Sequence, residues 1–108
     1  MPNETNEDKN QAQESEQYWK NIELFINQAN DMSAAQGMDN TASSFLYAAA
    51  RFSAFNATSK YKTAESLAQD KEEAVKYFTA TFKKMFQQNM DDYESNFNQY
   101  FKSQPDDK

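Results

Sequence analysis

Apolar residues recur along most of this chain at the spacing of α-helices. From about Glu16 to Gln36, residues three and four positions apart form one apolar face: Tyr18, Trp19, Ile22, Phe25, Ile26, Ala29 and Met32. Ser15 is placed to cap the start of this helix, and Gly37 is placed to end it in a left-handed conformation. No stretch shows the alternating pattern of a strand, so the sequence predicts an all-α fold.

A second predicted helix, from Asn40 or Thr41 to Ser59, is the most apolar part of the chain. Asp39 or Thr41 is placed to cap it, and Arg51 is its only charged residue. Its bulky residues share one strip and its small residues share another, so about two-thirds of its circumference is apolar. We therefore expect a compact bundle of three long helices with this helix at the centre.

A third predicted helix carries the longest apolar stripe, from Val75 through to Tyr100. Two starts fit the sequence: Thr63 as the N-cap, or a capping box formed by Asp70 and Glu73. The stripe is longer than the other two helices. A break near Asn89–Asp92, which we favour, lets a short fourth helix fold back. Without that break the end projects and needs a partner.

Length and charge predict one small domain with a tail at each end. The chain has 108 residues and a net charge of −6, and residues 1–17 hold five acidic side chains against one lysine. This leader has too few apolar groups to offset the entropy of ordering it. We predict an acidic disordered tail over 1–14, a helical-bundle domain over 15–102 and a second disordered tail over 103–108.

The composition excludes many kinds of active site. The sequence contains no histidine and no cysteine, so zinc fingers, Ser-His-Asp triads, haem axial histidines and disulfides are excluded. The acidic pairs Glu72/Glu73 and Asp91/Asp92 point about 100° apart on a helix and fit better as acids near a helix start. We expect no catalytic residue, no cofactor and no bound metal.

Tyr47 and Arg51 are the candidate contacts to a ligand or partner, because the single charge of the apolar helix lies one turn after a tyrosine. The guanidinium can stack on the Tyr47 ring and hold an anion. A structural ion pair with an acid of another helix is the favoured alternative. An enzymatic version, with Tyr47 as proton donor, requires a closed pocket and a strongly shifted pKa.

Two other classes of partner are disfavoured. Lysines alternate with tyrosine at Lys60-Tyr61-Lys62, as in some nucleic-acid binders. Residues 18–101, however, hold ten acidic side chains against eight basic ones, which makes this the weaker alternative. No run approaches the roughly 20 apolar residues that cross a bilayer, and none resembles a secretory signal. We expect a cytoplasmic protein with no membrane contact.

The candidate interface lies at the C-terminal end of the stripe and consists of Tyr93, Phe97, Tyr100 and Phe101. The apolar second helix has more surface than its two neighbours cover easily, and a second chain burying it in a symmetric dimer would resolve the surplus. The sequence therefore favours a non-enzymatic module that forms a homodimer or binds another protein.

Several segments resemble one bacterial family. They are Ser44-Phe-Leu-Tyr-Ala-Ala-Ala-Arg-Phe-Ser-Ala-Phe55, Tyr18-Trp19 followed by Phe25-Ile26-Asn27-Gln28-Ala29-Asn30, Asp70-Lys-Glu-Glu-Ala-Val-Lys-Tyr-Phe78, and Met90-Asp-Asp-Tyr-Glu-Ser-Asn-Phe97. Together they are similar to the small bacterial proteins grouped as domain of unknown function 3144, over roughly residues 18–101. The resemblance implies a short, cytosolic proteobacterial protein. It carries no established activity, so it transfers no catalytic residue.

Overall fold

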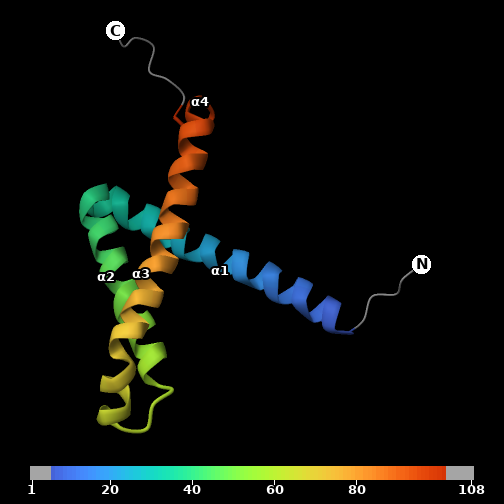
Figure 1. Cartoon of the computed structure of the whole chain (residues 1–108). Helices are drawn as coiled ribbons and strands as arrows, with labels where there is room; N and C mark the ends of the chain where they lie inside the picture. Colours follow the sequence, from blue (N-terminus) through green and yellow to red (C-terminus); the bar gives the residue numbers. More distant parts are fainter. Residues whose placement is uncertain (1–5, 102–108) are drawn as a thin grey trace. The chain divides into compact units, whose positions relative to one another are not determined.

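The computed structural model describes residues 6–101, and it describes side chains from residue 13 onward (Figure 1). The helices are α1 (Asn6–Gln36), α2 (Met38–Thr58), α3 (Ala64–Ser95) and α4 (Phe97–Tyr100). Residues 6–101 contain no strand. The predicted all-α class, with three long helices and a short fourth at the C-terminal end, is confirmed.

The chain divides into two units, with the division between Phe55 and Asn56 near the end of α2. The first unit contains α1 and most of α2. The second contains the end of α2, the turn that follows it, α3 and α4. A single domain over residues 15–102 stays a prediction.

Helix α1 is longer than predicted. It begins at Asn6, so the predicted start at Glu16 is wrong, and Ser15 lies inside the helix rather than at its N-cap. Residues 6–14 of the predicted disordered tail are helical. The prediction rested on the few apolar groups of the leader, but a helix forms its backbone hydrogen bonds within itself and does not require a buried face for each turn. Residues 1–5 of the predicted N-terminal tail lie outside the described residues. The whole of the predicted tail over 103–108 also lies outside them.

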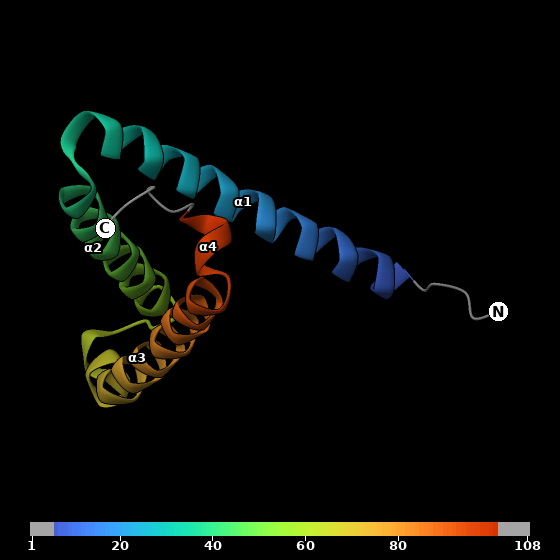
Figure 2. The same ribbon diagram turned by 90° about the horizontal axis from the view of Figure 1, so that it is seen from above.

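Gly37 separates α1 from α2, and Figure 2 shows the chain turning sharply there. Its φ of +97° lies in the region that glycine tolerates best, which confirms the predicted role in ending α1. The Gly37 N–H donates to the Ser33 carbonyl at 2.8 Å, and the Thr41 hydroxyl donates to the Gly37 carbonyl at 2.9 Å. Helix α2 therefore starts at Met38, earlier than predicted, and Thr41 lies within it instead of capping it.

Replacing Gly37 with alanine tests this junction. A Cβ at Gly37 would meet no atom within 4 Å, so the cost comes from the backbone conformation alone. We expect Gly37→Ala to lower the free energy of unfolding by about 1 kcal/mol, measured by urea denaturation followed by circular dichroism. Gly37→Asn is the control and should lose less, because asparagine adopts positive φ more readily. Equal stability of Gly37→Ala and the native protein would contradict this account.

Thr63 caps the start of α3, which decides between the two predicted starts. Its extended backbone (φ −137°, ψ 156°) lets the side-chain oxygen accept a hydrogen bond from the Ser66 N–H at 3.1 Å. Asp70 lies inside α3 and does not form the predicted capping box there. Its carboxylate instead accepts a hydrogen bond from the Tyr61 hydroxyl at 2.9 Å, which raises the pKa of Tyr61. This bond joins the turn before α3 to the second turn of the helix.

Removing the Thr63 hydroxyl should expose the Ser66 N–H without a partner. We expect Thr63→Ala to reduce the free energy of unfolding by about 1 kcal/mol. Thr63→Ser keeps the accepting oxygen and should stay within a few tenths of a kcal/mol of the native protein. Denaturation curves of the two variants provide the comparison, and a loss of the same size in both would show that the threonine methyl, not the cap, stabilises this start.

The described helices leave their apolar faces exposed. Among residues 13–101 no apolar side chain is buried, and Thr41, at 3% exposure, is the only buried side chain of any kind. Large apolar residues on all three long helices are between 37% and 75% exposed. Packing of these helices into a compact bundle around α2 therefore stays a prediction.

Candidate functional site

Aromatic side chains gather where α3 ends. The chain leaves helical geometry at Asn96 (φ −119°, ψ 32°) and re-enters it as α4, which lies at the end of α3 (Figure 1). The predicted break near Asn89–Asp92 is wrong in position, because α3 continues unbroken to Ser95. The prediction of a short C-terminal helix is confirmed.

The four candidate interface residues, Tyr93, Phe97, Tyr100 and Phe101, form one group, here called the C-terminal aromatic cluster. The rings of Tyr93 and Tyr100 meet edge to face with centroids 4.8 Å apart. Phe101 lies 5.7 Å from Tyr93 and stacks on Phe97 at 5.1 Å. Such arrangements are favourable beyond the apolar area that they bury. The structure thus brings together residues that sequence reasoning had placed on one stripe, and their use as an interface stays a prediction.

Asp92 holds this cluster together, and sequence reasoning missed its role. One carboxylate oxygen accepts a hydrogen bond from the Tyr100 hydroxyl at 2.7 Å, and the other accepts one from the Asn96 side-chain amide at 2.9 Å. The Asn96 N–H also donates to the Asp92 backbone carbonyl at 3.0 Å. The interpretation of Asp91 and Asp92 as acids at a helix start is wrong, since both lie near the C-terminal end of α3.

A signal for this contact was present in the sequence. Asn96 and Tyr100 follow Asp92 at intervals of four residues, which places all three on one side of a helix. The interval did not reveal that the chain would break at Asn96. That break sets the distance between the phenol and the carboxylate.

The cluster is a surface and not an enclosed cavity. Its four side chains are between 42% and 56% exposed, so about half of each ring remains open to solvent. Exposed aromatic side chains next to an oriented carboxylate suit contact with a protein surface better than they suit chemistry that excludes water.

Tyr47 and Arg51 lie on successive turns of α2, as predicted, and both are exposed. Tyr47 is 70% exposed, so the structure places this pair on an open helix surface. The closed pocket that the enzymatic alternative requires is not formed around them in the described part of the chain. Their use as ligand or partner contacts stays a prediction.

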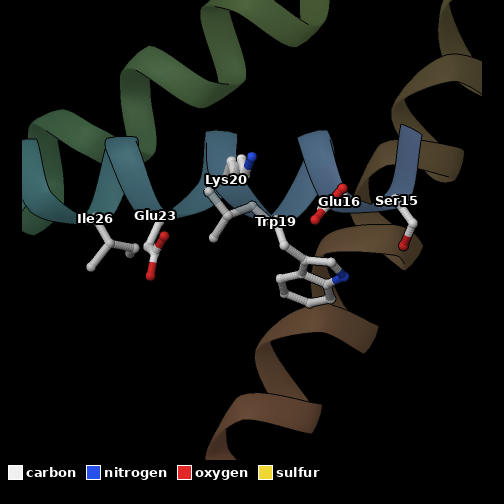
Figure 3. Close-up of a pocket in the computed structure, with 7 residues that line it drawn as sticks. Ser15, Glu16, Trp19, Lys20, Glu23 and Ile26 are labelled. Carbon is white, nitrogen blue, oxygen red and sulfur yellow. The ribbon is translucent and has the colours of Figure 1, made fainter. Parts of the chain in front are cut away.

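A shallow apolar surface on α1 was not singled out from the sequence. It is lined by side chains of α1 alone: Ser15, Glu16, Trp19, Lys20, Ile22, Glu23 and Ile26 (Figure 3). The Trp19 ring extends away from the helix and is 62% exposed, and the Tyr18 ring meets its edge at 5.3 Å. A hollow between side chains of one helix can contribute to an interface but does not enclose a substrate.

Among the side chains of residues 13–101 no group of three acids lies close enough together to hold a metal ion. None of the helices in this range is both long and apolar enough to cross a bilayer.

The fold and these open aromatic surfaces define a small all-α protein without an enclosed site in its described part. The chain belongs to the family "Protein of unknown function (DUF3144)", whose model matches residues 18–94. This confirms the resemblance seen in the sequence. No curated protein and no solved structure matches the chain.

The bond between Tyr100 and Asp92 gives a pH prediction. The hydrogen bond to the Asp92 carboxylate, followed by that carboxylate's charge, raises the pKa of Tyr100 above its ordinary value of 10.0. Because the pKa is raised in the folded state, the bond holds α4 in place below about pH 10 and is lost as the pH rises through the raised pKa. Absorbance titration of tyrosinate, taken as the difference between the native protein and Tyr100→Phe, should show this late titration.

Asp92→Asn is the control for this titration. The neutral amide carries no charge to oppose the phenolate, so the Tyr100 pKa should move down toward its ordinary value. An unchanged titration in Asp92→Asn would show that another group perturbs Tyr100.

Proposed function

We propose that this protein is a non-enzymatic, self-associating helical module that works by contact between apolar helix faces. The observation that carries the proposal is the exposure of large apolar side chains along α1, α2 and α3, with none buried among residues 13–101. Water disfavours such surface in proportion to its area. Exposed apolar surface of this extent is typical of a surface that another protein covers.

Helix length supports the same conclusion. Helix α1 has 31 residues and α3 has 32, and long helices in proteins obtain most of their stability from packing an apolar face. Capping at Thr63 and Gly37 fixes where helices begin and end but contributes only about 1 kcal/mol each. The remaining stabilisation has to come from covering the apolar faces, either by the chain's own helices or by a second copy.

A second copy is the favoured partner. In a symmetric dimer the same apolar face of each chain packs against the other, so one kind of contact covers that face on both chains. The C-terminal aromatic cluster is the proposed centre of recognition, since aromatic residues are enriched in such surfaces. Tyr47 and Arg51 are proposed as further partner contacts. A ligand-binding or enzymatic use of that pair is less well supported, because it lies open to solvent.

Binding to nucleic acid has weaker support. The lysines Lys83 and Lys84 share their surface hollow with Asp91 and two glutamines, so this part of α3 does not present the basic stripe that phosphate binding requires. The module is proposed to act in the bacterial cytoplasm, which rests on what the family resemblance implies.

Molar mass in solution tests the proposal. Size-exclusion chromatography with light scattering, at several concentrations of the full chain, should give twice the mass of one chain and a shift toward monomer on dilution. One chain mass at every concentration would contradict self-association.

The aromatic cluster can be tested in the same experiment. The double variant Phe97→Ser with Phe101→Ser removes two stacked rings and should weaken the dimer at least about tenfold, as loss of a central aromatic contact does. Tyr77→Ser is the matched control, because Tyr77 is an exposed aromatic residue of α3, outside the cluster and on the side of that helix opposite its apolar stripe, with 75% exposure. Equal weakening by both changes would exclude the cluster as the specific contact.

A further inference from the structure

The break between α3 and α4 is not caused by a residue that stops helices. Asn96 alone leaves helical geometry (φ −119°, ψ 32°), and residues 92–101 contain neither glycine nor proline. An unbroken helix would add three backbone hydrogen bonds here, donated by the N–H groups of residues 97–99. Within the described residues none of the three is formed, and the Gln99 N–H donates instead to the Asn96 carbonyl at 3.0 Å. Contacts between side chains therefore have to favour the break.

Two ring contacts of the C-terminal aromatic cluster require the break. Side chains of a helix lean the same way, toward its N-terminus, so two rings in an unbroken helix stay about as far apart along the axis as their Cα atoms. That separation is about 10.5 Å for Tyr93 and Tyr100 and about 12 Å for Tyr93 and Phe101. The observed centroid distances are 4.8 Å and 5.7 Å. An unbroken helix would separate both pairs.

The hydrogen bond from the Tyr100 hydroxyl to the Asp92 carboxylate, 2.7 Å long, also requires the break. In an unbroken helix the two residues would lie about 12 Å apart along the axis and about 80° apart around it. The Asp92 side chain would also lean away from Tyr100. The bond from the Asn96 amide to Asp92 spans only four residues, so it suits either form. The Tyr100 hydroxyl is thus the polar group that distinguishes the two forms.

The two forms are separated by a small number of exposed contacts. Each residue added to a helix favours it by a factor of about 1 to 1.6, so three residues favour the unbroken helix by at most about fourfold. One hydrogen bond to a carboxylate and two ring pairs oppose them. The forms also present different surfaces. In the unbroken helix Tyr93, Phe97 and Tyr100 would follow one another at helical spacing along the apolar side of α3.

We propose that residues 96–101 form a conformational latch at the end of α3. In the closed latch, Tyr100 bonds to Asp92 and the rings group beyond the break at Asn96. In the open latch, the helix continues to Phe101, and Phe97 and Tyr100 lengthen the apolar side of α3. The hydroxyl of Tyr100 selects the closed form. This inference concerns a single chain and does not depend on the self-association proposed above.

Removing that hydroxyl from the full chain is the first test. Tyr100→Phe keeps the ring and should shift the ratio of closed to open latch about tenfold toward open, as loss of an exposed hydrogen bond to a charged group does. The Cα chemical shifts of residues 96–99, measured by NMR, should move toward helical values. Tyr93→Phe is the matched control, because it removes a hydroxyl from the same cluster and leaves the bond between Tyr100 and Asp92 intact.

Two changes at Asn96 test the latch from the backbone. Asn96→Ala and Asn96→Gly both remove the side-chain amide, but alanine favours the interior of a helix and glycine disfavours it. We expect the alanine variant to open the latch and the glycine variant to keep it closed. In the open form the N–H groups of residues 97–99 are hydrogen-bonded, so their exchange with deuterium should be slower in Asn96→Ala than in Asn96→Gly.

The outcomes decide the proposal. A gain of helical shifts in Tyr100→Phe, absent from Tyr93→Phe, supports the latch. Shifts of an unfolded chain in Tyr100→Phe would overturn it, because the bond would then only hold down an end that otherwise frays. Unchanged shifts in Tyr100→Phe, or helical shifts through Asn96 in the native protein, would also overturn it. None of these results depends on the molar mass, so failure of the latch leaves self-association to be judged separately.

Discussion

Apolar surface that the described helices do not bury is the constraint on which this protein depends. Long helices are stable in water when one face packs against something, and between residues 13 and 101 the structure shows faces of aromatic and aliphatic residues without a buried core. The many aromatic side chains make burial more important, because each ring has a large apolar area whose burial would stabilise the fold. Any group that covers these faces therefore also stabilises the helices.

Local contacts of a few residues determine where each helix begins and ends. Gly37 ends α1 because it adopts a positive φ, and Thr63 starts α3 because its hydroxyl satisfies a free N–H. At the other end of α3, Asp92 accepts hydrogen bonds from both Asn96 and Tyr100. These two hydrogen bonds order the aromatic cluster around the Asp92 carboxylate. The bond from Tyr100 is lost when its phenol ionises, so the order of the cluster depends on pH.

Tyr93 belongs both to the apolar side of α3 and to the C-terminal aromatic cluster, where its ring meets Tyr100 edge to face. Because of this overlap, the order of the C-terminal cluster extends onto the apolar side of α3. The chain has few other means of recognition. It has no histidine or cysteine, and the charges of α3 occur in short runs of one sign, such as Lys83-Lys84 and Asp91-Asp92.

The sequence by itself determined the helical class, the turn at Gly37 and the membership of the aromatic cluster, because each follows from residue type and spacing within a few turns. It offered two starts for α3, and the hydrogen bond at Thr63 in the structure decided between them. It misplaced the start of α1 and the break after α3, since helix ends are decided by small differences between competing local conformations. Only the tertiary structure showed Asp92 holding Tyr100. That contact is made across the break at Asn96, and periodicity assumes that a helix continues.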